Sequence, residues 1–164
     1  MARKGMIGLA LVLVVVAAVV LIARDHQKPA DDYDYAAAFE ASAPGSTAPI
    51  LKITDVVGKT ADELRAVLGP PENCETSLYS SRCTYAPGQT EVVFIDGKAD
   101  WITINALGET VFDAAALARI GLSETKPTER SETELLWTSL PGLRELRVVG
   151  DGARIDFIRI KARS

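Results

Sequence analysis

The sequence predicts an α+β protein in which an N-terminal transmembrane helix precedes a tandem repeat of a short helix and an antiparallel three-stranded meander. Three observations predict it: an uncharged apolar run at residues 6–23, Asp-Gly turns between strand-like segments, and an approximate repeat covering about 55–105 and 109–164. The 164 residues have room for one modest domain and short extra segments. Barrels, large doubly wound enzymes and multidomain proteins are therefore excluded.

The distribution of charge argues against nucleic acid as a partner. Eighteen Lys and Arg residues stand against 22 Asp and Glu residues, for a net charge of −4. Residues 1–28 carry +3, residues 29–48 carry −4, and residues 49–164 carry −3. This balance implies no strongly basic face of the kind that binds a phosphate backbone.

The uncharged run at residues 6–23 is long enough to cross a bilayer. As a helix that rises about 1.5 Å per residue it extends roughly 27 Å, close to the hydrocarbon thickness of about 30 Å. A cleaved signal peptide is the alternative, although a cut after Ala23 would place Leu21 where a small residue is expected. We expect residues 1–24 to remain as a membrane anchor. Basic residues on both sides of the run leave its orientation open.

The only two cysteines, Cys74 and Cys83, enclose a short polar loop, ETSLYSSR. This spacing suits a disulfide formed in an oxidising compartment, with two free thiols as the alternative. It fits neither a CxxC redox motif nor a zinc site, because no second pair or nearby histidine is present. A disulfide would place the domain outside the cytoplasm. We therefore expect a single-pass protein of the inner (cytoplasmic) membrane, with its C-terminal domain in the periplasm or outside.

Residues 25–48 mix acids, Ala, Ser and Pro without sustained apolar periodicity. This composition predicts a tether between the membrane and the domain. The acidic cluster at 31–34 lacks the Gly and the closing Glu of a calcium-binding loop, so a solvated spacer is the simpler interpretation. Tyr33, Tyr35 and Phe39 either order this segment against a partner or rest on the domain.

The domain at residues 49–164 begins its first repeat with a predicted helix. Thr60 provides an N-cap before ADELRAVL, and Gly69 followed by two prolines ends the helix. The segments RCTYAPG, EVVFIDG and KADWITI then predict three strands. The last two are joined at Asp96-Gly97, because an Asp-Gly pair readily adopts the positive φ angles of a hairpin turn.

The second repeat follows the same order. Asp113 caps the helix-like segment DAAALARIG, and ELLWTSLPG, ELRVVGDG and ARIDFIRI supply the predicted strands. In this alignment Glu91 corresponds to Glu145, and Trp101 corresponds to Phe157. Chance similarity between two amphipathic hairpins is the alternative to a true repeat.

Alternation of apolar and polar residues assigns two faces to the predicted sheet. The face expected to pack on the helices carries Val92, Phe94, Ile102, Ile104, Leu146, Val148, Ile158 and Ile160. The opposite face is expected to be open to solvent or to a partner. It carries Glu91, Val93, Trp101, Thr103, Glu145, Arg147, Phe157 and Arg159.

A motif runs from VGKTADEL at 57–64 through VLGPP at 67–71 to Tyr85 before Gly88 and VVF at 92–94. It resembles the SmpA/OmlA small envelope lipoproteins and the related beta-lactamase-inhibitor-protein fold. The resemblance implies a short helical unit packed on an antiparallel sheet, sometimes in tandem, whose sheet or loops grip another protein. No lipobox cysteine follows the apolar run, so lipid anchoring to an outer membrane is not implied.

The residue inventory argues against catalysis and against a bound cofactor. The only histidine, His26, lies in the predicted tether, which excludes a Ser/His or Cys/His nucleophile in the domain. The GKT at 58–60 lacks the upstream glycine of a phosphate-binding loop. Asp100 and Asp156 occupy matching places in the two repeats, which explains the pair without glycosidase chemistry. We expect no enzyme activity, no cofactor and no metal site.

These observations together predict a non-catalytic protein-interaction module of the bacterial cell envelope, with an envelope protein of unknown identity as partner. The candidate partner-binding residues are Trp101, Phe157, Tyr85 and Trp137, because aromatic anchors surrounded by charge are typical of such surfaces. Packing in the core is the alternative for Tyr85 and Trp137. Inhibition of an exported hydrolase is the second hypothesis, and an envelope enzyme is the third.

Overall fold

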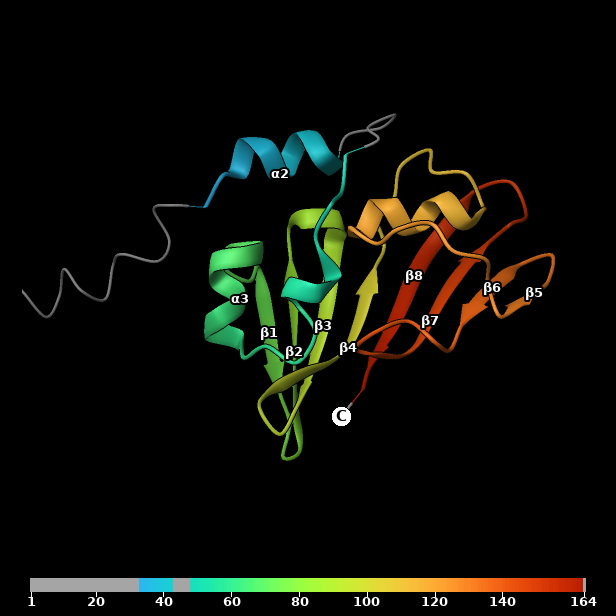
Figure 1. Cartoon of the computed structure of the whole chain (residues 1–164). Coiled ribbons are helices and arrows are strands. Elements are labelled where there is room, and N and C mark those ends of the chain that lie inside the picture. The colour runs from blue at the N-terminus through green and yellow to red at the C-terminus, as the bar shows by residue number, and fades with distance from the viewer. Residues whose placement is uncertain (1–32, 43–47, 164) are drawn as a thin grey trace, which may run out of the picture. The chain divides into compact units, whose positions relative to one another are not determined.

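The fold is built on one antiparallel sheet of eight strands in the order β1-β2-β3-β4-β8-β7-β6-β5 (Figure 1). The computed structural model describes residues 33–42 and 48–163. The strands are β1 (Asn73–Thr76), β2 (Ser80–Tyr85), β3 (Thr90–Ile95), β4 (Lys98–Ile104), β5 (Glu129–Arg130), β6 (Glu134–Trp137), β7 (Leu143–Gly150) and β8 (Ile155–Ala162). The helical segments are α2 (Tyr35–Ser42), η1 (Ile53–Asp55), α3 (Ala61–Leu68), η2 (Pro87–Gln89) and η3 (Ala114–Ile120).

The predicted unit of one helix and a three-stranded meander is wrong. The residues from α3 to β4 supply four strands, the residues from η3 to β8 supply four more, and β4 pairs with β8 to make one continuous sheet. The strands missed by the sequence analysis are β1 and β5, which form the two edges. All four residues of β1 (NCET) are exposed and β5 has only two residues, so neither shows the apolar alternation that reveals a strand.

The predicted membrane segment at residues 6–23 lies outside the described residues. Within 33–42 and 48–163, no helix combines the length and the apolar character needed to cross a bilayer.

The cross-strand register shows how the two groups of strands correspond. Val92 pairs with Ile102 in β3–β4, and Val148 pairs with Ile158 in β7–β8, so matched residues lie 56 positions apart. By this register Glu91 corresponds to Arg147, and the predicted match of Glu91 with Glu145 is wrong by two residues. The sequence alignment matched the two Asp-Gly turns, but the turn between β3 and β4 is shorter than the turn between β7 and β8. The hydrogen-bonded pairing of the strands gives the correct correspondence.

The face of the sheet that packs on the helical segments holds the core (Figure 1). Alternation predicted this face correctly. Its eight predicted residues are all at most 2% exposed: Val92, Phe94, Ile102, Ile104, Leu146, Val148, Ile158 and Ile160. Leu64 and Leu68 of α3, and Leu117 and Ile120 of η3, pack into the same cluster.

Two polar caps fix the starts of the helical segments, as predicted. The Thr60 side chain accepts a hydrogen bond from the backbone N–H of Glu63, whose carboxylate accepts one from the Thr60 N–H at 2.8 Å. Asp113 accepts a hydrogen bond from the backbone N–H of Ala115 at 2.9 Å. The segment that follows Asp113 is a 3₁₀ helix rather than the α-helix expected there.

A short helix, α2, lies inside the stretch predicted to be a tether. Just before it, the Tyr33 ring lies against Gly69, where a Cβ atom would come within 2.9 Å of the ring. Burial of Tyr33 raises the pKa of its hydroxyl. Gly69 also has a φ of 78°, which few other residues adopt. Of the two alternatives for this tyrosine, the structure shows the one in which it rests on the domain.

The capping box makes the stability of the domain depend on pH. The hydrogen bond from the Thr60 backbone N–H, followed by that from the Thr60 hydroxyl, lowers the pKa of Glu63 below its ordinary value of 4.5. A carboxyl with a lower pKa in the folded state stabilises the fold above its unfolded pKa and stops doing so as pH falls through the folded value. We expect Glu63→Gln to lower the free energy of unfolding at pH 7, and this loss to shrink at acidic pH.

Urea denaturation of both proteins between neutral and acidic pH measures this difference. Glu124→Gln is the matched control, because the exposed Glu124 carboxylate has no hydrogen bond or ion pair with the described residues. A difference between wild type and Glu63→Gln that stays constant with pH would contradict the role given to the Glu63 charge.

Candidate binding face of the sheet

Two aromatic side chains lie beside two cations on the face of the sheet opposite the helices. Trp101 of β4 and Lys161 of β8 are neighbours in the register, and the Lys161 Nζ lies 4.8 Å from the centre of the Trp101 ring. The guanidinium carbon of Arg159 lies 5.3 Å from the centre of the Phe157 ring. Both distances are within the range of a cation–π interaction. The centre of this face therefore combines apolar area with positive charge.

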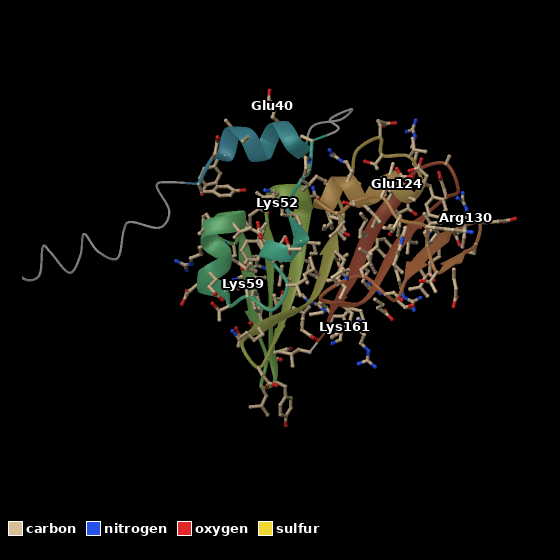
Figure 2. The ribbon with its side chains drawn as sticks, in the orientation of Figure 1. Glu40, Lys52, Lys59, Glu124, Arg130 and Lys161 are labelled. Carbon is tan, nitrogen blue, oxygen red and sulfur yellow. A yellow bond between two sulfur atoms is a disulfide. The ribbon has the colours of Figure 1, made fainter. Side chains whose placement is uncertain are left out.

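A β-bulge holds Lys161 in place. Phe94 pairs with Ala99 and Val93 pairs with Trp101, so Asp100 is the extra residue on β4. The Asp100 carboxylate forms an ion pair with the Lys161 Nζ, and only 10% and 16% of the two side chains is exposed. Figure 2 labels Lys161 on the ribbon. Because its charge is already paired, Lys161 contributes mainly its stem and its contact with Trp101 to this surface.

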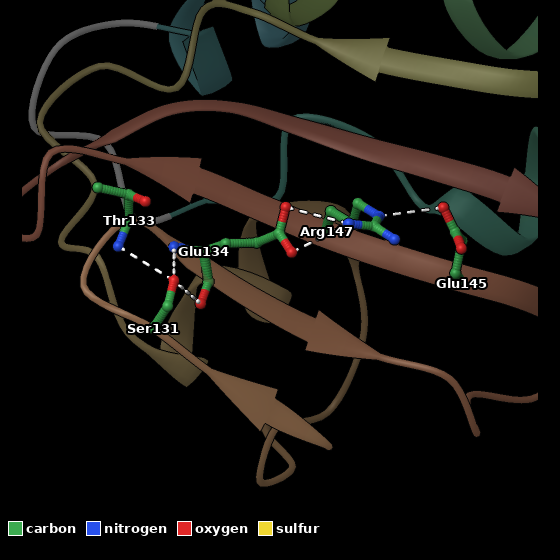
Figure 3. Close-up of polar contacts among 5 residues, drawn as sticks. All are labelled: Ser131, Thr133, Glu134, Glu145 and Arg147. Carbon is green, nitrogen blue, oxygen red and sulfur yellow. Dashed lines mark hydrogen bonds and ion pairs between the residues drawn. The ribbon is translucent and has the colours of Figure 1, made fainter.

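Arg147 is held between two carboxylates (Figure 3). Its Nε donates to Glu145 at 3.1 Å, and its Nη1 donates to the two oxygens of Glu134 at 3.0 and 3.2 Å. The backbone N–H of Glu134 donates in turn to the Ser131 hydroxyl at 2.9 Å. These bonds, with Glu145 first, raise the pKa of Arg147 above its ordinary value. The network fixes the Arg147 guanidinium and neutralises its charge.

A similar ion pair spans β2 and β3 with the signs exchanged. The Arg82 Nε lies 3.6 Å from the Glu91 carboxylate. Arg82 is opposite Val93 and Glu134 is opposite Val149, so Arg82 and Glu134 occupy corresponding positions. The strand pairs β2–β3 and β6–β7 therefore have similar registers, but the acidic and basic partners of the ion pair are exchanged between them.

Arg159 differs from the other cations of this face. Within the described part of the chain, no carboxylate lies at ion-pair distance from its guanidinium, which lies over the Phe157 ring. Arg159 is exposed, and its neighbour in the register, Arg147, is already neutralised. A shallow groove passes over this region, lined by Trp101, Glu134, Glu145, Arg147, Val149, Phe157 and Arg159.

The four predicted aromatic residues separate into two pairs. Trp101 and Phe157 lie on the open face, both partly exposed. Tyr85 is 0% exposed and Trp137 is 2% exposed, so both fill the core and neither lies on this face. Burial raises the pKa of the Tyr85 hydroxyl. The Trp137 indole N–H donates to the Thr125 carbonyl at 3.0 Å.

The predicted disulfide between Cys74 and Cys83 is confirmed. The two residues lie opposite each other on β1 and β2, so the bridge ties the edge strand to its neighbour. A bridge of this kind is typical of domains that fold in an oxidising compartment.

One exposed apolar feature was missed by the sequence analysis. Leu78 and Tyr79, in the turn between β1 and β2, are 85% and 82% exposed. The loop between the cysteines was expected to be polar, because six of its eight residues are Ser, Thr, Glu or Arg. The adjacent Leu and Tyr inside a stretch closed by two cysteines were the signal that could have revealed it.

Comparison with known proteins gives little similarity. No family model matches the chain, and no curated protein matches it. Among solved structures, the chain is similar to an extracellular protein containing a SCP domain from Bacillus anthracis str. Ames, with 13% identity and a TM-score of 0.46. The match covers 68% of this chain and 45% of that protein, so this chain spans less than half of its length.

The buried ion pair predicts unequal effects of two conservative substitutions. Asp100→Asn leaves the nearly buried Lys161 ammonium without its carboxylate, and we expect a loss of about 1–3 kcal/mol in the free energy of unfolding. Glu91→Gln breaks the more exposed pair with Arg82 and is expected to cost less than about 1 kcal/mol. Urea denaturation of the wild type and both variants at pH 7 measures the two losses in the free energy of unfolding. Equal losses would show that the Asp100 pair is no more important than a surface contact.

Proposed function

We propose that the chain is a membrane-anchored, non-catalytic module of the bacterial cell envelope that binds a protein partner outside the cytoplasm. Residues 6–23 would hold it in the inner membrane as a single-pass anchor, and the open face of the sheet would contact the partner. The observation that carries this proposal is the pair of partly exposed aromatic rings, Trp101 and Phe157, that lie beside cations at the centre of that face.

The chemistry of the open face supports a protein partner. Aromatic residues and arginine are enriched at the centres of protein interfaces, where they supply large contact areas with few rotatable bonds. Here Trp101 and Phe157 have that role. Arg159 of β8, which forms no ion pair with another described residue, lies beside the Phe157 ring. The network around Arg147 fixes side chains before binding, which lowers the entropy lost when a partner docks.

The compartment is supported by the disulfide and by the apolar run. The Cys74–Cys83 bridge favours folding outside a reducing cytoplasm. The predicted anchor at 6–23 would then leave the domain on the exported side. The non-catalytic character is supported by the inventory of residues, since the only histidine of the chain, His26, precedes the domain.

Substitution of the two rings tests the binding face. In cells that produce the full chain, we expect Trp101→Ala combined with Phe157→Ala to reduce chemical crosslinking to the partner at least about tenfold, because central aromatic residues contribute more than about 1.4 kcal/mol each to binding. Val111→Ala is the matched control, since Val111 is an exposed apolar residue at 59% exposure away from this face. Adducts that persist unchanged in the double variant would remove this face from consideration.

Protease accessibility tests the compartment. With an epitope tag at the C-terminus of the full chain, protease added to spheroplasts is expected to remove the tag while a cytoplasmic control protein stays intact. N-terminal sequencing of the recovered protein should begin at or near Met1. A protected tag, or a mature chain that begins well after Ala23, would contradict the proposed anchor.

A further inference from the structure

A second surface, separate from the open face, lies at the turn between β1 and β2. This turn, Ser77–Ser80, places Leu78 and Tyr79 in solvent with 85% and 82% of their surfaces exposed. Figure 2 shows side chains at this turn projecting past the end of the sheet. Neither residue belongs to the core cluster. Two large apolar side chains that add nothing to the core require another explanation.

The residues of this turn are not those that favour a turn. At the β3–β4 turn, Asp96 and Gly97 have φ angles of 50° and 73°, the geometry that matches the twist of the flanking strands. Leu78 and Tyr79 are absent from the residues with positive φ. A Leu-Tyr pair thus opposes both turn propensity and solvation, and such local conflicts are expected at functional positions.

One disulfide and three hydrogen bonds hold the turn in place. The Cys74–Cys83 disulfide joins its two strands. The Ser77 N–H donates to the Ser80 carbonyl at 2.8 Å, and the Ser77 hydroxyl donates to the same oxygen at 2.9 Å. The Ser80 N–H donates back to the Ser77 hydroxyl at 3.2 Å. The apolar pair is therefore displayed on a rigid support, which reduces the conformational entropy lost on binding.

The surroundings of the turn favour a protein over a lipid surface. Ile95, 39% exposed, lies opposite Ser80 in the register, and a shallow groove runs between the β1–β2 and β3–β4 turns. The nearest charged residues on these hairpins are of both signs in equal number: Glu75, Arg82, Asp96 and Lys98. An apolar projection that enters an anionic membrane usually has a basic collar, which is missing from this part of the described domain.

The turn lies at the end of β2 far from Ile50, one of the first residues of the continuous described stretch 48–163. The strand β2 runs from this turn towards η2, where the Ile50 side chain lies 2.8 Å from the position of a Cβ atom on Gly88. Six strand residues separate the two ends, a distance of roughly 20 Å. Ile50 and Gly88 therefore lie near the opposite end of β2 from Leu78 and Tyr79.

We propose that Leu78 and Tyr79 form a rigid apolar projection that inserts into a pocket of a second protein. The pocket is lined by apolar side chains that receive Leu78 and the Tyr79 ring, and it offers a hydrogen-bond acceptor to the Tyr79 hydroxyl. Its rim contacts Ile95 across the groove. This contact is independent of the one proposed for Trp101 and Phe157, so the projection binds its partner equally well when those two rings are removed.

Site-specific photocrosslinking in cells tests the projection. A photoreactive phenylalanine analogue is placed at position 78 or, as a control, at position 111 of the full chain. We expect a discrete adduct with another protein from position 78 and none of the same mass from position 111, because Val111 is exposed but lies outside the turn.

Competition by co-produced full-length chains shows whether the adduct depends on the projection. The wild-type chain and the Trp101→Ala/Phe157→Ala chain should suppress the adduct equally, whereas Leu78→Ser/Tyr79→Ser should be at least about tenfold weaker as a competitor. The melting temperature and the disulfide of the Ser variant should match those of wild type, because both side chains are exposed.

Four results would overturn the inference: no protein adduct at position 78, labelling of lipid alone, an adduct with a second copy of the chain, or equal competition by the Ser variant. If the Trp101→Ala/Phe157→Ala chain failed to compete, binding by the projection would require the open face. That result would contradict the proposed independence of the two surfaces. An open-face adduct that persists unchanged in the Trp101→Ala/Phe157→Ala chain, together with a retained position 78 adduct, would contradict only the function proposed for Trp101 and Phe157.

Discussion

The pairing of β4 with β8 is the contact on which the rest of the structure depends. Ile102 lies opposite Ile160, and Ile104 lies opposite Ile158, so the two groups of four strands join through four fully buried side chains. Separated, each group would expose a row of unpaired backbone groups and one side of its apolar cluster. Joined, they share one core, and each group protects the edge of the other.

The same pairing assembles the open face. Side chains alternate across a strand, so the register that buries Ile102 and Ile160 also places Trp101 beside Lys161 on the opposite side. A slip of one residue would exchange the two faces and expose the core residues. The β-bulge at Asp100 then supplies the carboxylate that neutralises Lys161 without breaking the ladder on either side. Core packing and surface chemistry are consequently set by one register.

Local signals in the sequence were sufficient for the parts of the fold that depend on local physics. The alternation around Val92 and Ile102 predicted the buried face, Thr60 predicted the helix cap, and the cysteine spacing predicted the disulfide. The edge strands β1 and β5 were missed because exposed edges carry no apolar pattern. Burial of Tyr85 and Trp137 depends on which face of the completed sheet their side chains occupy. Exposure of Leu78 and Tyr79 depends on how far the β1–β2 hairpin extends beyond the rest of the sheet. Tertiary structure decides both, and the sequence pattern alone does not contain it.

The exchanged ion pairs give the open face a direction. The strand register of β3–β4 repeats in β7–β8, so a partner that docked on this backbone pattern would have two candidate poses related by half a turn. Arg82 with Glu91 at one end, and Glu134 with Arg147 at the other, make the two poses electrostatically different. A ligand whose charges complement one pose meets like charges in the other, which costs binding free energy. A partner that docked on this face would therefore be held in a single orientation by polarity, although the backbone register would permit two.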